Sequence, residues 1–172
     1  MKKIKIHAWD KKPRTMLRFI KIGDIFCYQF EENIFVFGQV IGKVSVGHVI
    51  QFFDIFKTKP VISAQEINRA HFVNKPIIVD SYSLFDKSPV RIWRIIGHQA
   101  DFDQTPFQNL VFKWGDPNGD KFGKTGIDGT VYAKAFSKEE VEGLDWEFCV
   151  GSISYNKILQ EEISKKGIED LF

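Results

Sequence analysis

Runs of apolar and β-branched residues, separated by short polar breaks, occupy the first third of the chain. Residues 25–30 and 34–41 form two such runs with three polar residues between them, which is typical of a β-hairpin. A third run follows at residues 46–56. Gly38 interrupts the second run, which indicates a bulge or a closely packed neighbour. Three consecutive runs of this kind predict an antiparallel meander that bends strongly or curls toward a small barrel.

Shorter β-type runs continue this pattern beyond residue 60. They lie at residues 76–79, 90–96, 110–114 and 130–136, with Ser- and Pro-bearing connections between them. A Gly-rich stretch at residues 115–126 separates the last two runs, and its turn-forming residues predict a loop. Most of the regular structure before residue 136 is therefore expected to be strand.

Two helical segments complete the prediction. Ser63 and Glu66 have the spacing of a capping box, which favours a short helix over residues 63–70. Near the C-terminus, the apolar residues between positions 158 and 163 share one face of a helix that Gly167 would end.

The predicted fold class is α+β, mostly antiparallel β, with a strongly bent sheet or small barrel-like core and C-terminal helices. A chain of 172 residues can bury one hydrophobic core without disulfides or metals. Neither a linker nor an internal repeat divides it. We predict a single domain over residues 1–172, made of a basic lead-in at 1–22, a β-rich core at 23–136 and an acidic helical tail at 137–172.

Charge is unevenly distributed along the chain, although the net charge is only +2. Residues 1–22 contain eight Lys or Arg against one Asp, whereas residues 137–172 contain nine Asp or Glu against four Lys. This asymmetry fits two solvated faces or docking surfaces for charged partners. No stretch has the apolar length of a signal peptide or a membrane span, so we expect a cytoplasmic protein without a membrane partner.

The Gly-rich stretch contains two partial ligand motifs. Residues 123–125 (Gly-Lys-Thr) match the end of a phosphate-binding loop, but Asn118 stands where that loop requires glycine. Asp116, Asn118 and Asp120 have the spacing of the first ligands of a calcium loop, which then lacks its glycine and its final carboxylate. We therefore predict a hairpin loop, and neither a metal nor a cofactor.

Candidate catalytic groups are few and incomplete. His98 is followed closely by Asp101 and Asp103, and paired carboxylates near a histidine can perform acid-base chemistry. A hydrolase therefore remains an alternative function. Cys27 and Cys149 could in principle meet His98 as nucleophiles, but both lie in apolar contexts that raise the pKa of a thiol. Since no active site is completed along the chain, the protein is predicted not to be an enzyme.

The basic lead-in suggests a second alternative. Trp9 and Phe19 lie among its lysines, and this mixture of charge and aromatic rings can contact phosphates and stack on bases. A nucleic-acid-binding small β-barrel is therefore conceivable. However, the middle of the chain offers no basic stripe, so nucleic acid is not the partner that the sequence favours.

Five short segments, taken in order, resemble the immunity protein 26 family of bacterial polymorphic toxin systems, over about residues 20–115. They are Gly23-Asp24-Ile25-Phe26, Phe37-Gly38-Gln39-Val40, Phe52-Phe53-Asp54, Trp93-Arg94-Ile95-Ile96-Gly97 and Pro106-Phe107. The resemblance implies a predominantly β immunity protein that binds a cognate toxin stoichiometrically and blocks its active site or substrate path.

The resemblance assigns the motif residues to the fold and not to the toxin contact. It implies backbone roles for the glycines and core positions for Phe26, Val40 and Trp93. The full set is Gly23, Asp24, Phe26, Gly38, Val40, Trp93, Gly97 and Pro106.

A contact surface is a separate hypothesis. If the cognate toxin is a nuclease with a basic cleft, an acidic face would steer association and occupy the path of the phosphates. The acidic tail supplies five carboxylates and one aromatic anchor. These are Glu139, Glu140, Glu142, Asp145, Glu147 and Trp146.

Overall fold

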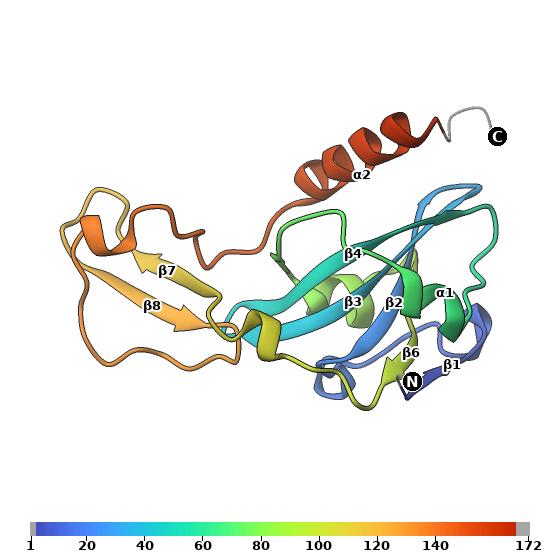
Figure 1. Cartoon of the computed structure of the whole chain (residues 1–172), viewed down its shortest axis with the longest axis horizontal. Helices are drawn as coiled ribbons and strands as arrows, with labels where there is room; N and C mark the ends of the chain where they lie inside the picture. Colours follow the sequence, from blue (N-terminus) through green and yellow to red (C-terminus); the bar gives the residue numbers. More distant parts are fainter. Residues whose placement is uncertain (1–2, 168–172) are drawn as a thin grey trace.

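A six-stranded antiparallel sheet forms the main body of the protein, in a computed structural model that describes residues 3–167. Its strands lie in the order β1-β6-β2-β3-β4-β5 (Figure 1). Their bounds are β1 Ile4–Ile6, β2 Asp24–Glu31, β3 Ile34–Val44, β4 Gly47–Lys57, β5 Ile77–Val79 and β6 Trp93–Gln99. The predicted meander is confirmed as β2, β3 and β4, and the mostly antiparallel α+β class is confirmed with it.

The sheet is open, because β1 and β5 lie at its two edges and do not pair with each other. The register of β3 against β4 shifts at two places, between Val36 and Gly38 and between Val40 and Gly42. A further shift separates Ile25 from Phe26 where β2 meets β6. Bulges of this kind bend a strand. Because β1 and β5 do not pair with each other, the meander nevertheless does not close into the small barrel that the sequence left open.

Both faces of the sheet are covered. One face packs against η2 (Leu17–Phe19), the π-helical turn η3 (Tyr82–Lys87) and α2 (Ser152–Lys166). The opposite face packs against α1 (Ala64–Arg69) and η1 (Trp9–Lys11). Because both faces are buried, the central strands read as nearly continuous apolar runs rather than as an alternation.

Trp93 is the centre of the larger core. Its ring stacks on Tyr28 at 4.3 Å between centroids, and Phe26 lies 5.3 Å away. Tyr155 of α2 and Phe85 of η3 meet the same ring edge-on at 5.4 and 5.7 Å. Sheet, π-helical turn and C-terminal helix are thus joined through one aromatic cluster.

The turn before β2 explains the first pair of motif residues. Gly23 has φ +90°, and a Cβ there would lie 2.6 Å from the carbonyl oxygen of Gln99. Only glycine fits such a position. Asp24 is buried, accepts a hydrogen bond from the backbone N–H of Lys21 at 2.8 Å, and lies 2.9 Å from Nδ1 of His98. Burial raises the pKa of the Asp24 carboxyl.

The other motif residues lie mainly in the sheet. Gly38 faces the ring of Phe26 so closely that a Cβ would collide with it. At Gly97 a Cβ would lie 2.6 Å from Cδ1 of Ile6 in the neighbouring strand. Val40 is fully buried, and Pro106 lies in the short 3-10 helix η4 (Thr105–Phe107), outside the sheet. Neither Gly38 nor Gly97 therefore has room for a larger side chain, and Val40 packs within the core.

A second, two-stranded sheet projects from the main body (Figure 1). It pairs β7 (Val111–Gly115) with β8 (Phe122–Gly126), and residues 127–147 wrap around it. We call residues 111–147 the arm. Its own core contains three buried residues, Phe122, Phe136 and Val141. Near its base, Phe112 and Ile127 pack against Ile41, Val44, Val49 and Ile78 of the main body.

The arm differs most from the sequence prediction. The second half of the Gly-rich stretch is strand β8, because its backbone pairs with β7 throughout, and only its first half is a hairpin turn. The strand expected at residues 130–136 is wrong, since Val131 and Phe136 make only isolated bridges to β8. Strand β1 was also missed, although Ile4 and Ile6 alternate with Lys there.

The helical predictions are confirmed. In α1, Ser63 accepts from the backbone N–H of Glu66, and the Glu66 carboxylate accepts from the backbone N–H of Ser63, completing the capping box. Helix α2 ends at Gly167, which has φ +60°. None of the helices between residues 3 and 167 combines the length and the apolarity needed to cross a membrane.

Candidate functional site

Trp146 lies between two hollows at the arm. The first has a volume of about 340 Å³ and is lined by Phe122, Val141, Glu139, Glu142 and two lysines. The second, of about 230 Å³, lies between arm and main body and is mainly apolar, with Ile77, Phe112, Phe148 and Val150 in its wall. Trp146 contributes to both walls, so one aromatic side chain is presented to two neighbouring cavities.

The backbone of β7 holds Trp146 in place. The Lys113 N–H donates to the Asp145 carbonyl at 2.9 Å, and the Glu147 N–H donates to the Lys113 carbonyl at 2.7 Å. The indole meets Phe122 edge-on at 6.0 Å, and the Lys113 ammonium lies 5.1 Å from its centroid. Trp146 is thereby ordered before any partner arrives, which limits the entropy that binding would cost.

Three of the five carboxylates predicted for this surface have partners elsewhere. Glu140 accepts from the Ser137 backbone at 2.8 Å and pairs with Lys134 at 3.1 Å. Asp145 pairs with Lys75 at 2.6 Å. Glu147 accepts a hydrogen bond from the Ser45 hydroxyl at 2.6 Å. Their charges stabilise the arm and its junction with the body.

Glu139 and Glu142 remain on the wall of the first hollow. Both are exposed, and hydrogen bonds from its own backbone N–H and from Ser137 lower the pKa of Glu139. Lys113 and Lys138 line the same hollow, so its charges are mixed rather than uniformly acidic. The structure thus brings Glu139, Glu142 and Trp146 together and leaves the other three predicted residues at its margins.

Phe148 is the main residue of this region that the sequence argument did not single out. Its side chain is 55% exposed at the edge of the second hollow. The signal was the local pattern of Trp146, Glu147 and Phe148, in which two aromatic residues flank a charge. The same pattern occurs in ordinary strands, so it does not by itself indicate a binding site. Only the structure shows that no other side chain buries Phe148.

The His98 cluster is not assembled. His98 pairs with Asp24 of the neighbouring strand. Asp101 accepts from the backbone N–H of Lys3 at 2.8 Å, and Asp103 accepts from that of Thr105 at 2.9 Å. Asp103 thus stabilises its own turn, as Asp residues commonly do, whereas Asp101 holds the backbone of the distant N-terminal segment. The hydrolase alternative loses the arrangement on which it depended.

The remaining polar candidates have structural surroundings. Asp116 accepts from the backbone N–H of Asn118 at 2.9 Å and so shapes the β7–β8 turn. Within residues 3–167, no three His, Cys, Asp or Glu side chains are grouped in a way that could hold a metal ion. Cys27 and Cys149 are free, and burial raises the pKa of both thiols.

An open antiparallel sheet, with a projecting arm that presents an aromatic residue between two hollows, defines a protein suited to binding another macromolecule. Comparison with protein families matches residues 21–117 to Immunity protein 26. Since the match covers more than half of the chain, the protein belongs to the immunity protein 26 family, whose members are immunity proteins of toxin systems. A search of curated proteins found no match, and neither did a search of solved structures.

Proposed function

We propose that the protein binds a cognate bacterial toxin in a stoichiometric complex and neutralises it through the surface around Trp146. This Trp146 surface consists of Trp146, Glu139 and Glu142 at the first hollow and Phe148 at the second. The observation that carries the proposal is an ordered, partly exposed aromatic anchor with a cavity on either side, in a chain of an immunity protein family. Aromatic anchors beside pockets commonly supply most of the affinity of an interface.

The position of this surface relative to the family match supports the proposal. The match spans residues 21–117, so it includes β2 to β6 of the main sheet and β7, but neither β1 nor residues 137–150. A shared body can then supply the fold, while a segment outside the match supplies recognition of one particular toxin. Specificity requires contacts that differ between relatives, and the Trp146 surface lies where such differences can accumulate without disturbing the core.

The charge of the arm indicates the kind of toxin. Residues 111–147 contain eight Asp or Glu against five Lys, for a net charge of −3. A toxin with a basic cleft, such as a nuclease that holds substrate phosphates, would complement this charge. Attraction between opposite charges accelerates encounter and selects the partner. Neutralisation then follows from occupying the cleft and needs no catalysis by the immunity protein.

Co-expression with the cognate toxin tests the proposal, and any toxin gene found next to this one is the first candidate. We expect growth to be rescued and the two proteins to co-purify in equal amounts. Phe148→Ala, at a side chain that is already 55% exposed, should leave folding intact. At an anchor position it should weaken binding by about 2 kcal/mol, roughly thirtyfold. Unchanged affinity in this variant and in Trp146→Phe would contradict the assignment of the surface.

Charge reversal tests the electrostatic part separately. The double variant Glu139→Lys/Glu142→Lys should slow association with the toxin by tenfold or more at low salt, and by less at high salt. The matched control is Glu31→Lys/Glu32→Lys, which makes the same change in net charge at two exposed positions, the last residue of β2 and the turn that follows it. Equal effects from the two pairs would mean that only overall charge matters.

A further inference from the structure

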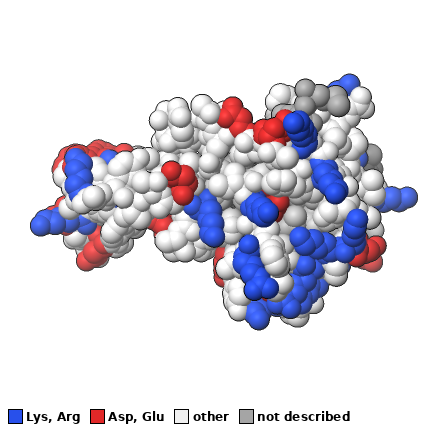
Figure 2. All heavy atoms as spheres, turned by 90° about the horizontal axis from the view of Figure 1, so that it is seen from below, with Lys and Arg blue, Asp and Glu red and all other residues white. Residues whose placement is uncertain are grey.

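A basic hollow lies on the main body, where β2 begins and β6 ends, and no residue of the arm lines it. It has a volume of about 220 Å³, and its wall includes Lys5, Lys12, Lys21 and Phe19. His7, His98 and Asp24 complete its polar lining. Figure 2 shows Lys and Arg side chains gathered on one side of the main body, whereas the arm carries both signs of charge. The charge asymmetry of the sequence is thus concentrated around one cavity.

Strand pairing assembles the floor of the hollow. Lys5 of β1 lies opposite His98 of β6, and His98 lies opposite Asp24 of β2. Both carboxylate oxygens of Asp24 are engaged, one by His98 and the other by the backbone N–H of Lys21. Because Asp24 is buried and already hydrogen-bonded, it only partly offsets the charge of the three lysines.

The lysines of the hollow form no ion pair with a carboxylate in the part of the chain that the structure describes, although the charge of Lys12 interacts at longer range with Asp24 in the same wall. Their ammonium groups take part in none of the ion pairs found among residues 3–167, in contrast to Lys57, Lys75, Lys134 and Lys165, which each pair with a carboxylate. Three cations held around one cavity repel one another. An anion in the hollow would relieve this repulsion.

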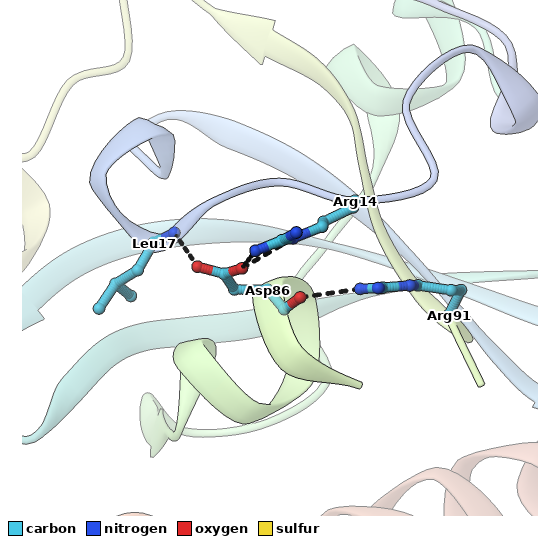
Figure 3. A network of polar contacts seen from close by, with 4 residues as sticks. All are labelled: Arg14, Leu17, Asp86 and Arg91. Carbon is cyan, nitrogen blue, oxygen red and sulfur yellow. Dashed lines mark hydrogen bonds and ion pairs between the residues drawn. The ribbon is translucent and has the colours of Figure 1, made fainter. Parts of the chain in front are cut away.

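The segment that carries Lys12 and Phe19 is fixed and not a free arm. Asp86 of η3 accepts hydrogen bonds from the Arg14 side chain and, at 3.0 Å, from the backbone N–H of Leu17 (Figure 3). The backbone carbonyl of Asp86 accepts from Arg91 in the same network. The Thr15 N–H donates to the Phe85 carbonyl at 3.1 Å. The hollow is therefore organised before any ligand binds.

Phe19 adds a flat apolar surface to this charge. Its side chain is 46% exposed, and the Arg18 guanidinium lies 4.9 Å from its ring centroid. Trp9, the other aromatic residue of the lead-in, is unavailable because it packs edge-on against Phe35 beneath Arg94. An exposed ring beside several cations is the arrangement by which proteins hold unpaired bases and their phosphates.

We infer that this hollow binds a nucleotide phosphate, with Lys5, Lys12 and Lys21 around the phosphate and the base against Phe19. The ligand chemistry is shared by free nucleotides and by single-stranded RNA or DNA. A duplex would keep its bases stacked inside and could not use Phe19. This inference does not depend on the Trp146 surface, because the basic hollow shares no lining residue with the two hollows beside Trp146.

Binding is tested with four probes on the full chain: inorganic phosphate, adenosine 5′-monophosphate, a labelled oligothymidylate of about ten nucleotides, and a polyglutamate peptide of similar charge. Anisotropy or calorimetry gives the affinity. We expect the oligothymidylate to bind, with log K falling against log salt at a slope of about −2 for three contacts. If adenosine 5′-monophosphate also binds, free nucleotides as well as single-stranded nucleic acid are ligands of the hollow.

Two variants locate the binding. Lys5→Gln/Lys12→Gln/Lys21→Gln should reduce affinity at least tenfold and flatten the salt dependence, whereas the control Lys43→Gln/Lys59→Gln/Lys157→Gln removes the same charge from exposed positions elsewhere. Phe19→Ala should weaken the oligothymidylate and leave inorganic phosphate unchanged. Toxin neutralisation should survive both variants.

Four outcomes would overturn the inference. They are no binding of any nucleotide probe at low salt, equal losses in the hollow variant and its control, no effect of Phe19→Ala on the oligothymidylate, or polyglutamate binding as tightly as the oligothymidylate. The last would indicate an acidic protein segment instead. Thermal unfolding of each variant shows whether a lost affinity reflects a lost fold, and Phe19→Ala tests the site if the triple lysine variant does not fold.

Discussion

The main body and the arm use aromatic residues in opposite ways. In the body, Trp93 is 2% exposed and its ring contacts five other aromatic rings. In the arm, Trp114 and Tyr132 are both 43% exposed, and the local core has three buried residues. The body buries its aromatic side chains in the core, whereas the arm leaves some of its aromatic side chains exposed to solvent, where a partner could contact them. Regions with few buried contacts open more easily, and binding segments are commonly drawn from them.

The largest effect expected is the loss of the central ring of the body. Trp93→Ala should lower the free energy of unfolding by about 3–5 kcal/mol, because it leaves a cavity among packed aromatics. Trp114→Ala, at a half-exposed position of the arm, should cost under about 1 kcal/mol. Urea unfolding of both variants measures the difference. Similar losses would mean that the arm contributes to the core as much as the body does.

Lowering the pH should destabilise the body before it destabilises the arm. His48 is buried in β4 with Nδ1 2.9 Å from the Ser81 hydroxyl, and burial lowers its pKa from 6.5 to about 4. Between those pH values the unfolded chain binds a proton that the folded protein does not. Stability should therefore fall as pH drops from 6.5 to 4, by about 3 kcal/mol in total.

His48→Asn keeps a polar group near Ser81 and removes this titration. Unfolding free energies at several pH values should show a flatter profile for the variant over the same window. The arm, residues 111–147, contains no histidine, so its amide exchange should not change in that window for this reason. An unchanged pH slope in His48→Asn would assign the acid sensitivity to other groups.

Substitutions of two glycines that pack beneath aromatic rings give a finer comparison of packing in the body and in the arm. A Cβ at Gly38 would collide with the buried Phe26, and one at Gly123 would collide with the exposed Trp114. Gly38→Ala should cost about 1–3 kcal/mol, because Phe26 cannot move without disturbing the core. Gly123→Ala should cost under about 1 kcal/mol, since Trp114 can swing toward solvent. Thermal unfolding measures both, and the reverse order would contradict this account.

The smallest effect concerns two similar caps. Ser63 caps α1 on the body, and Ser137 accepts from the Glu140 backbone N–H at 3.4 Å at the start of the 3-10 turn η5 (Glu139–Val141) in the arm. Ser63→Ala should cost about 1 kcal/mol. Ser137→Ala should cost less, because it caps a single turn of three residues. Denaturant midpoints compare them, and a larger loss at Ser137 would show that the arm depends on this turn.

The sequence predicted the body better than the arm. The runs that became β2, β3 and β4 are apolar, long and separated by clear turns, so local pattern and tertiary environment agree. In the arm, the sequence did not reveal strand β8, because Gly123 and Gly126 interrupt any alternation of apolar and polar residues. The strand forms because its backbone pairs with β7. Residues 130–136 have strand-like composition, yet their backbone meets β8 only at isolated positions.

The candidate site was predicted in part. Composition pointed to an acidic tail with Trp146, and the structure places Trp146, Glu139 and Glu142 together. Composition could not indicate that Asp145 and Glu147 have partners, because Lys75 and Ser45 are distant in the chain. The partners of Glu140, Lys134 and Ser137, are close in the chain. The sequence also could not show the partner of His98, which pairs with the distant Asp24 and not with Asp101 or Asp103 nearby in the chain.

The sequence by itself determined the strand meander, the capped helix, the family resemblance and the separation of basic and acidic segments, since each depends on neighbours a few residues apart. Only the tertiary structure decided that Trp146 lies between two hollows and that Lys5, Lys12 and Lys21 surround another. The physical reason is that both sites depend on strand register across long separations. Lys5, His98 and Asp24 become neighbours only when β1, β6 and β2 pair.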